Sequence, residues 1–180
     1  MTGGDRGDTV TVRLAAVADA EALARCHLAC WQETYAGLVD AQRLADAVAA
    51  VGDRAERWRQ ILTDSPGTLL AVAAGEPVGF GAAGPQRDPD LQVGLELYAL
   101  YLRRSHQQAG VGHRLLQAVV GNADCSLWVL AANSRARTFY SRHGFMADGA
   151  RTVDDLFGLE IRMVRSATGG AGVLAPTHPG

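Results

Sequence analysis

Two glycines, Gly110 and Gly112, stand between an apolar segment and an amphipathic one, an order that suits the binding of an anion. The apolar run of residues 95–102 predicts a buried central strand, and the apolar spacing within residues 115–120 predicts a helix. The first N–H groups of a helix lack intrahelical partners, and glycines leave room for a phosphate to approach them. The segment therefore predicts a phosphate site, although two glycines can equally serve close packing of backbones.

A second group of chemistry-bearing residues follows within residues 127–145. After an apolar strand-like run, Asn133 stands where its side chain can cap a helix. Tyr140 shares one face of that helix with Phe139 and His143, and this spacing by itself is typical of a core aromatic.

Together the two segments resemble the cofactor-binding motifs of the GNAT superfamily of acyl-CoA N-acetyltransferases. The first is a Q/R-x-x-G-x-G/A turn that begins at Gln107, and the second is an N-x-x-A-x-x-F-Y-x-x-x-G-F helix that begins at Asn133. The resemblance covers residues 9–165 and implies one GNAT N-acetyltransferase domain of α/β type. It implies a central mixed sheet of six or seven strands flanked by about four helices, and acetyl-CoA as the co-substrate.

The resemblance places acetyl-CoA in a V-shaped split beside the central strand, with the pantetheine along free backbone groups and the pyrophosphate at the glycine turn. The residues thereby assigned to the cofactor are Leu100, Leu102, Gln107, Gln108, Ala109, Gly110, Val111, Gly112, His113, Asn133 and Tyr140. Gln108 and Ala109 depart from the commonest family turn, Q-G-R-G-x-G. Phosphate attraction is expected to be weaker, but binding survives because the backbone N–H donors do not depend on side chains.

The resemblance also implies roles in catalysis. Tyr140 would donate a proton to the departing thiolate of the cofactor. The acceptor amine must lose its own proton, because an alkylamine with a pKa of about 10.4 is protonated at neutral pH. Glu96, eleven residues before Gln107, matches a catalytic strand glutamate of some family members, and a carboxylate in an apolar strand invites explanation. A salt-bridged or strand-end glutamate is the alternative left open.

In this family the first two helices form the wall that meets the acceptor. Trp31 and Tyr35 could hold a cationic amine over their rings, and Glu33 is a second candidate base, although Trp31 as a core residue is the alternative. The acceptor is a small amine or a peptide, with polyamines, amino sugars, amino acids and peptide N-termini all open. We expect direct attack by the amine rather than a cysteine intermediate, because no cysteine lies in either motif.

Two other functional classes remain open. A GNAT-like acyl-CoA-binding or regulatory module without turnover would keep the cofactor motifs, but the presence of both Tyr140 and Glu96 argues against it. A nucleotide-binding module on the same turn predicts that ATP competes at least as strongly as CoA. The G-x-G-x-x-G run of residues 79–84 lies in a predicted strand and leads into a proline-containing loop rather than a helix. These three glycines are expected to ease a bulge or close packing instead.

Composition limits the class of partner. The chain has 180 residues, 48% of them apolar, which suits one domain with a full core. Its net charge of −2, with 17 basic and 19 acidic residues and no block of like charge, argues against a nucleic-acid or membrane surface. Three cysteines without metal-ligand spacing fit a reducing cytoplasm. We expect a cytoplasmic protein without a metal, nucleic-acid or membrane partner, and leave a homodimer open.

The elements that must position these residues follow from periodicity and capping signals. Asp19 is expected to cap a first helix ending near Gly37, Asp40 to open a second, and Asp53 with Glu56 to form a capping-box-like pair on a third. Strands are expected at residues 9–14, 68–73, 78–83, 95–102, 125–129, from 145 and at 156–164. Residues 1–8 and 166–180 are expected to be disordered.

Overall fold

A computed structural model describes residues 9–49, 51–107 and 110–166, so Gln108, Ala109 and nearly all of the two terminal segments lie outside the described residues. The elements are β1 (Thr11–Leu14), α1 (Ala20–Tyr35), α2 (Ala41–Ala49), α3 (Val51–Asp64), β2 (Leu69–Ala73), β3 (Glu76–Pro85), β4 (Leu95–Leu102), α4 (Val111–Val120), β5 (Cys125–Leu130), α5 (Ser134–Arg142), β6 (Met146–Asp154) and β7 (Gly158–Arg165). Short 3₁₀ turns cover Val17–Asp19 and Arg104–His106. Within the described ranges there are thus five α-helices, in agreement with the five segments expected from the sequence and with the about four helices that the resemblance implied.

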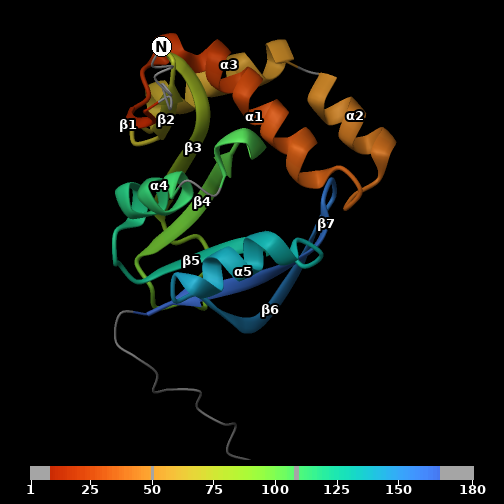
Figure 1. Cartoon of the computed structure of the whole chain (residues 1–180). Coiled ribbons are helices and arrows are strands. Elements are labelled where there is room, and N and C mark those ends of the chain that lie inside the picture. Colours follow the sequence, from red (N-terminus) through yellow and green to blue (C-terminus); the bar gives the residue numbers. More distant parts are fainter. Residues whose placement is uncertain (1–8, 50, 108–109, 167–180) are drawn as a thin grey trace, which may run out of the picture.

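The seven strands form one mixed sheet in the order β1-β2-β3-β4-β5-β7-β6 (Figure 1). The predicted α/β class and strand number are therefore confirmed, and β4 occupies the central position that its apolar sequence predicted. Pairing is antiparallel except between β4 and β5, which run parallel. The helix α4 connects these two strands, as a crossover between parallel neighbours requires.

Helices cover both faces of the sheet (Figure 1). On one face, α4 and α5 share a core with β4, β5 and β7 that includes Leu97, Leu116 and Tyr140. On the other face, α1 and α3 pack on β2 and β3 through a core that includes Leu23, Trp58 and Phe80. The turn between β6 and β7 reaches α1 and α2, where Phe157 joins a third core.

The central strand β4 pairs with its parallel neighbour β5 over only part of its length. Pairing joins residues 95–97 of β4 to residues 125–127 of β5, whereas β4 itself continues to Leu102. Beyond residue 97, the edge of β4 that faced β5 therefore has no strand partner among the described residues. Backbone N–H and C=O groups on such an edge are available to a ligand.

A β-bulge in β4 lies where the two strands separate. Ala82 and Ala83 of β3 are neighbours, but they stand opposite Ala99 and Leu97, so Tyr98 is an extra residue on β4. The bulge reverses the alternation of side chains. As a result, Leu97 and Leu100 both pack towards α4, and Tyr101 packs towards α1.

The glycines of residues 79–84 lie in β3 and are required by close contacts. A Cβ atom on Gly79 would lie 2.6 Å from the carbonyl oxygen of Tyr101, and one on Gly81 would lie 2.8 Å from Cγ2 of Val119. A Cβ atom on Gly84 would lie 2.6 Å from the ring of Tyr98. The expectation of close packing, rather than a dinucleotide site, is confirmed.

Two capping predictions are wrong. Asp19 precedes α1, but its carboxylate binds Arg13 at 2.7 Å and the backbone N–H of Ala16 at 2.8 Å instead of capping the helix. Asp53 lies inside α3, which already includes Val51. Sequence patterns for caps fail here because an arginine from a neighbouring strand competes for Asp19 and because the helix extends further back. The predicted cap at Asp40 is confirmed, since Oδ1 accepts from the N–H of Arg43 at 2.9 Å.

Candidate functional site

The N-terminus of α4 is built to receive an anion. Gly110 has a φ of +72°, a left-handed conformation that other L-residues adopt only at a cost, and no side chain caps the helix after it. The carbonyl oxygen of Gly110 accepts from the N–H of Arg114 at 3.0 Å, so the N–H groups that precede Arg114 in the helix have no intrahelical partner. These donors and the helix dipole favour a phosphate at this point.

Gln107 joins this turn to the open edge of β4. Its Nε2 donates to the carbonyl oxygen of Leu102 at 2.8 Å, so that carbonyl already has one partner. The other amide atom, Oε1, is buried and has no hydrogen-bond partner among the described residues. Leu100 and Leu102 are half-buried, with their side chains on the α4 side of the sheet.

Gly112 has a different role from Gly110. A Cβ atom at Gly112 would lie 3.4 Å from the ring of Phe139, so this glycine lets the start of α4 pack against α5. Next to it, Nδ1 of His113 lies 3.0 Å from Nε2 of His143, whose Nδ1 lies 2.8 Å from the carbonyl oxygen of Phe139. Because the carbonyl can only accept, His143 donates to it through Nδ1. The packing alternative thus describes Gly112, and His113 helps to join the two helices.

Asn133 caps α5 as predicted. Its Oδ1 accepts from the N–H of Ala136 at 3.0 Å, and its own N–H donates to the carbonyl oxygen of Leu130 at 2.9 Å. The residue therefore fixes the turn from the end of β5 into α5. That turn lies where β4 and β5 no longer pair, so the cap also sets where α5 begins.

Tyr140 is buried on the α5 side of the sheet, with 8% of its surface exposed. Burial raises the pKa of its phenol above the usual value of about 10, and the proximity of Tyr101 and Cys125 adds to the effect. No hydrogen bond joins the Tyr140 hydroxyl to the described residues. A protonated phenol with an unused donor suits proton transfer to a leaving group.

Glu96 is an ion-paired residue of the core, with 1% of its surface exposed. Its Oε2 accepts from Nε of Arg87 at 3.0 Å and from the backbone N–H of Arg87 at 3.2 Å, while Oε1 accepts from Nη2. The guanidinium also lies over the ring of Tyr98, 4.4 Å from its centroid. The structure therefore shows the salt-bridged glutamate that the sequence left open. A role for Glu96 as base stays a prediction, and it requires Arg87 to release an oxygen.

The loop after β3 is fixed over this face of the sheet by Arg162, which the sequence analysis did not single out. Nη2 of Arg162 donates to Asp90 at 2.7 Å, Nη1 donates to Asp88 at 3.2 Å and Nε donates to Asp148 at 2.7 Å. Trp128 donates to the same Asp88 carboxylate at 3.0 Å. These ion pairs raise the pKa of Arg162, and they hold the loop that carries Arg87 in place.

The carboxylate of Glu33 is hydrogen-bonded to the two arginines that follow β4. Its Oε1 accepts from Nε of Arg103 at 2.8 Å, and its Oε2 accepts from the backbone N–H of Arg104 at 2.6 Å. Burial alone would raise the pKa of Glu33, but these hydrogen bonds and charges outweigh it and hold that pKa below its ordinary value. Glu33 thus ties α1 to the turn after β4. The guanidinium groups of both arginines contact Glu33, since Nη2 of Arg104 also donates to its backbone carbonyl oxygen at 2.6 Å.

Trp31 and Tyr35 are core residues, exposed by 7% and 8%. The cation over the Trp31 ring is Arg54, whose Cζ lies 4.3 Å from the ring centroid, and Phe157 meets the same ring edge-to-face at 5.1 Å. The hydroxyl of Tyr35 shares a hydrogen bond of 2.8 Å with that of Tyr101. Both hydroxyls lie on the side of β4 opposite to the helices α4 and α5.

A carboxylate missed by the sequence analysis, Glu160, lies on β7 directly opposite Leu130 of β5. The alternation of apolar and polar residues in Leu159–Val164 is the signal that could have found it. Ile161 and Met163 pack towards α5, so Glu160 faces the side of Trp31 and Tyr35. No hydrogen bond or ion pair joins its carboxylate to the rest of the described chain.

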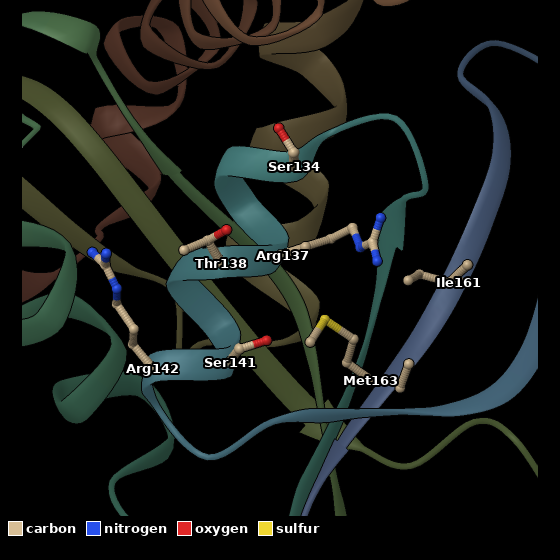
Figure 2. A pocket seen from close by; sticks show the side chains of 8 residues that line it. Ser134, Arg137, Thr138, Ser141, Arg142, Ile161 and Met163 are labelled. Carbon is tan, nitrogen blue, oxygen red and sulfur yellow. The ribbon is translucent and has the colours of Figure 1, made fainter.

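A surface pocket of about 530 Å³ lies between α5 and β7, and Figure 2 shows the side chains that line it. Its lining combines hydroxyl and arginine side chains of α5 with Ile161 and Met163 of β7, and Arg137 extends towards β7 while the guanidinium of Arg142 points away. None of the predicted site residues lines this pocket. In the described ranges, no three histidine, cysteine or acidic side chains gather as a metal site, and no helix is long and apolar enough to span a membrane.

Comparisons with known proteins agree with this architecture. A model of the GNAT acetyltransferase domain matches residues 65–147. A "probable N-acetyltransferase" of Mycobacterium tuberculosis is 29% identical over 172 residues, covering 89% of this chain and 97% of the relative.

Solved structures share the fold. A GCN5-related N-acetyltransferase of Rhodopseudomonas palustris superposes with a TM-score of 0.67 at 21% identity, over 91% of this chain and 99% of that one. The PaiA N-acetyltransferase of Thermoplasma acidophilum, solved in complex with coenzyme A, superposes with a TM-score of 0.64 at 19% identity, over 88% of this chain and 99% of that one.

Proposed function

This chain belongs to the GNAT superfamily of N-acetyltransferases, and we propose that it transfers an acetyl group from acetyl-CoA directly to a primary amine of a small molecule or peptide. One observation carries the proposal: β4 parts from β5 after residue 97 and then leads to the uncapped N-terminus of α4. An open strand edge that is followed directly by an anion site suits a ligand with an amide-containing arm and a pyrophosphate.

The chain's own groups fit such a ligand. The edge of β4 from Tyr98 to Leu102 supplies backbone donors and acceptors for the arm, and the N–H groups after Gly110 supply donors for the phosphates. Asn133, Gln107 and the backbone of residues 110–113 line the same path in our proposal. The coenzyme A complex of the Thermoplasma protein supports acyl-CoA as the ligand class.

Tyr140 is the general acid in this proposal. Its phenol is protonated at neutral pH, lies next to the open edge of β4 and has no competing hydrogen bond among the described residues. Once the amine has formed its C–N bond and the C–S bond breaks, the departing sulfur takes the proton of this phenol. Neutralising the thiolate favours its departure.

The acceptor wall is formed in this proposal by α1 and by the turn between β6 and β7. Trp31 and Tyr35 shape it from the core, and Glu33 keeps α1 in position through Arg103 and Arg104. The carboxylate of Glu33 is therefore a poorer candidate for the base than the sequence suggested. Glu96 stays a predicted base whose test is given below.

Thermal unfolding with acetyl-CoA tests the cofactor without knowledge of the acceptor. At a concentration near 100 times Kd, a specific ligand adds about 2.7 kcal/mol, which for a domain of this size raises the melting temperature by about 5 to 10 °C. A saturable shift that ATP does not match supports acetyl-CoA, whereas an equal or larger shift with ATP indicates a nucleotide-binding module. Binding without thiol release from acetyl-CoA with any amine of a broad panel indicates the non-catalytic module.

A further inference from the structure

Glu160 combines three properties that the other carboxylates near the predicted site lack together. It is half-buried, it has no hydrogen bond or ion pair among the described residues, and it faces the side of the sheet that the acceptor wall covers. Glu96 and Glu33, by contrast, each hold an arginine. A half-buried carboxylate without a partner has lost part of its hydration with nothing to replace it, so its presence at this point favours a cationic ligand.

The strand register fixes where Glu160 lies. It is the cross-strand partner of Leu130, and direct partners on antiparallel strands present their side chains on the same face. Leu130 packs with Trp31 and Tyr35, and Tyr101 joins the same cluster. The pairing therefore brings Glu160 to the tyrosine pair at the end of β5, next to the open edge of β4.

The tyrosine pair connects this carboxylate to the opposite side of the sheet. The Glu160 carboxylate is near enough to Tyr35 and Tyr101 to raise the pKa of both hydroxyls, after the larger effect of their burial. Tyr101, in turn, is near enough to raise the pKa of Tyr140, whose side chain packs on the α5 side of the sheet. Where β4 and β5 are apart, a carboxylate and a phenol can thus act on one group from opposite sides.

We propose that Glu160 binds the ammonium group of the acceptor and takes its proton. The hydroxyls of Tyr35 and Tyr101 lie beside it as hydrogen-bonding partners for the bound amine. This inference rests on the proposed function. The amine, once deprotonated, forms the C–N bond at the thioester carbon, and the C–S bond breaks. Of the two protons that the nitrogen loses overall, the first goes to Glu160 and then to water. The second replaces the proton that Tyr140 has given to the thiolate.

The charged surroundings of Glu160 suit this task. Burial raises its pKa, and the nearby carboxylate of Asp154 on β6 raises it further. The groups that face it from other elements are Tyr35 on α1 and Tyr101 on β4, while Arg43 of α2 reaches the same turn and donates to the carbonyl oxygen of Asp155 at 3.1 Å. A carboxylate with a raised pKa is a better base than an ordinary one once it is ionised.

The first experiment compares wild-type protein with Glu160→Gln. Thiol release from acetyl-CoA is measured with putrescine, 2-phenylethylamine, glucosamine and an alanine-terminated tetrapeptide as probes, and thermal unfolding is followed with CoA plus each amine. We expect the variant to show no rise in melting temperature with amine, and its kcat/KM to fall by about 100-fold. The rise in melting temperature that acetyl-CoA produces should be retained. Glu76→Gln, an exposed glutamate at the start of β3, is the matched control and should behave as wild type.

The second experiment changes the charge beside Glu160 and not Glu160 itself. Oδ1 of Asp154 accepts from the N–H groups of Leu156 and Phe157, both at 2.8 Å, and an asparagine keeps that oxygen. Asp154→Asn should therefore move the acidic limb of the kcat/KM profile to lower pH and leave the fold intact. A merely structural role for Glu160 predicts no such movement.

The outcomes separate this inference from the function on which it rests. If no amine produces an effect that depends on Glu160, or if Glu96→Gln rather than Glu160→Gln removes the acidic limb, the inference is overturned. The amine-induced change in melting temperature can be read whether or not the protein turns over acetyl-CoA, whereas the acidic limb is read from turnover. If acetyl-CoA alone gives no shift, the proposed transferase function is overturned instead, and the amine-binding measurement still decides the case of Glu160.

Discussion

The hydroxyls of Tyr35 and Tyr101, 66 residues apart in the chain, share a hydrogen bond of 2.8 Å. It joins the last residue of α1 to the central strand at a point beyond the end of its pairing with β5. The bond therefore attaches the wall formed by α1 to the open edge of β4. It also brings two protonated phenols to the side of the sheet opposite Tyr140, so the proposed acid and the proposed base lie on opposite sides of the gap between β4 and β5.

Replacing Tyr140 with phenylalanine should lower kcat by about 100-fold, because the phenol proton is lost while the ring remains. The Kd for acetyl-CoA and the melting temperature should stay close to those of the wild type, since the buried hydroxyl has no hydrogen bond among the described residues to lose. Steady-state kinetics and acetyl-CoA titration check this. Tyr98→Phe, at a half-exposed ring that donates to the carbonyl oxygen of Pro85, is the matched control. Equal losses in kcat and affinity would show that the Tyr140 ring is structural.

Replacing Gly110 with alanine should destabilise the protein by about 1 kcal/mol, because its φ of +72° is left-handed, and should weaken acetyl-CoA binding as the turn shifts. Gly52→Ala is the control, since Gly52 lies within α3 with open space around its Cβ position and should gain about 0.5 to 1 kcal/mol. Denaturant unfolding and acetyl-CoA titration check both. Unchanged affinity in a stable Gly110→Ala protein would remove this turn from the cofactor site.

Replacing Asn133 with alanine should cost about 1 kcal/mol of stability, because the N–H of Ala136 loses its acceptor. Asn133→Asp keeps an acceptor oxygen and should restore most of the loss. Urea unfolding of the two variants measures the cap, and the same proteins titrated with acetyl-CoA report on the proposed second role. An affinity that falls in Asn133→Asp, with stability restored, would separate that role from capping.

Replacing Arg87 with methionine should cost about 2 kcal/mol, because it leaves the carboxylate of Glu96, 1% exposed, without its ion-pair partner. The expected loss of stability is smaller than for a fully buried ion pair because the Arg87 side chain is 65% exposed. Adding Glu96→Gln to Arg87→Met should recover much of the loss. A double variant no more stable than Arg87→Met would mean that the ion pair is not the source of the effect.

Stability should fall in acid partly through His27. Burial lowers the pKa of His27 to about 3, with Arg54 adding to the effect, and Trp58 donates to its Nδ1 at 3.2 Å. In the unfolded chain the ordinary pKa is about 6.5, so the unfolded state binds more protons between these values and stability is lost as the pH falls through that range. At pH 4.5 the loss from this residue is about 3 kcal/mol. Unfolding free energies from pH 7 to 4.5 should show a shallower fall in His27→Gln, and equal slopes would contradict the prediction.

Much of the local structure in the proposed cofactor region could be predicted from the sequence because its signals are local. The glycine before a helix, the asparagine cap and the tyrosine seven residues after it are set by backbone geometry within a single turn or helix. Gly110 and Asn133 accordingly have the conformations that their residue types predicted. The partners of Glu96 and Glu33 could not be predicted in this way, since each is paired with an arginine brought near by the tertiary fold.

The sequence by itself thus determined the strands, most helices and the residues that border the turn of α4. Only the tertiary structure decided which way the side chains of β4 point. Residues 95–102 are apolar on both faces, so nothing in their pattern reveals the extra residue at Tyr98. Without that bulge, Tyr101 lies four residues after Leu97 in a regular strand, so both side chains would share one face and Tyr101 would point towards α4. With it, Tyr101 turns to Tyr35 on α1 and towards Glu160, because register and bulges are set by cross-strand packing rather than by local preference.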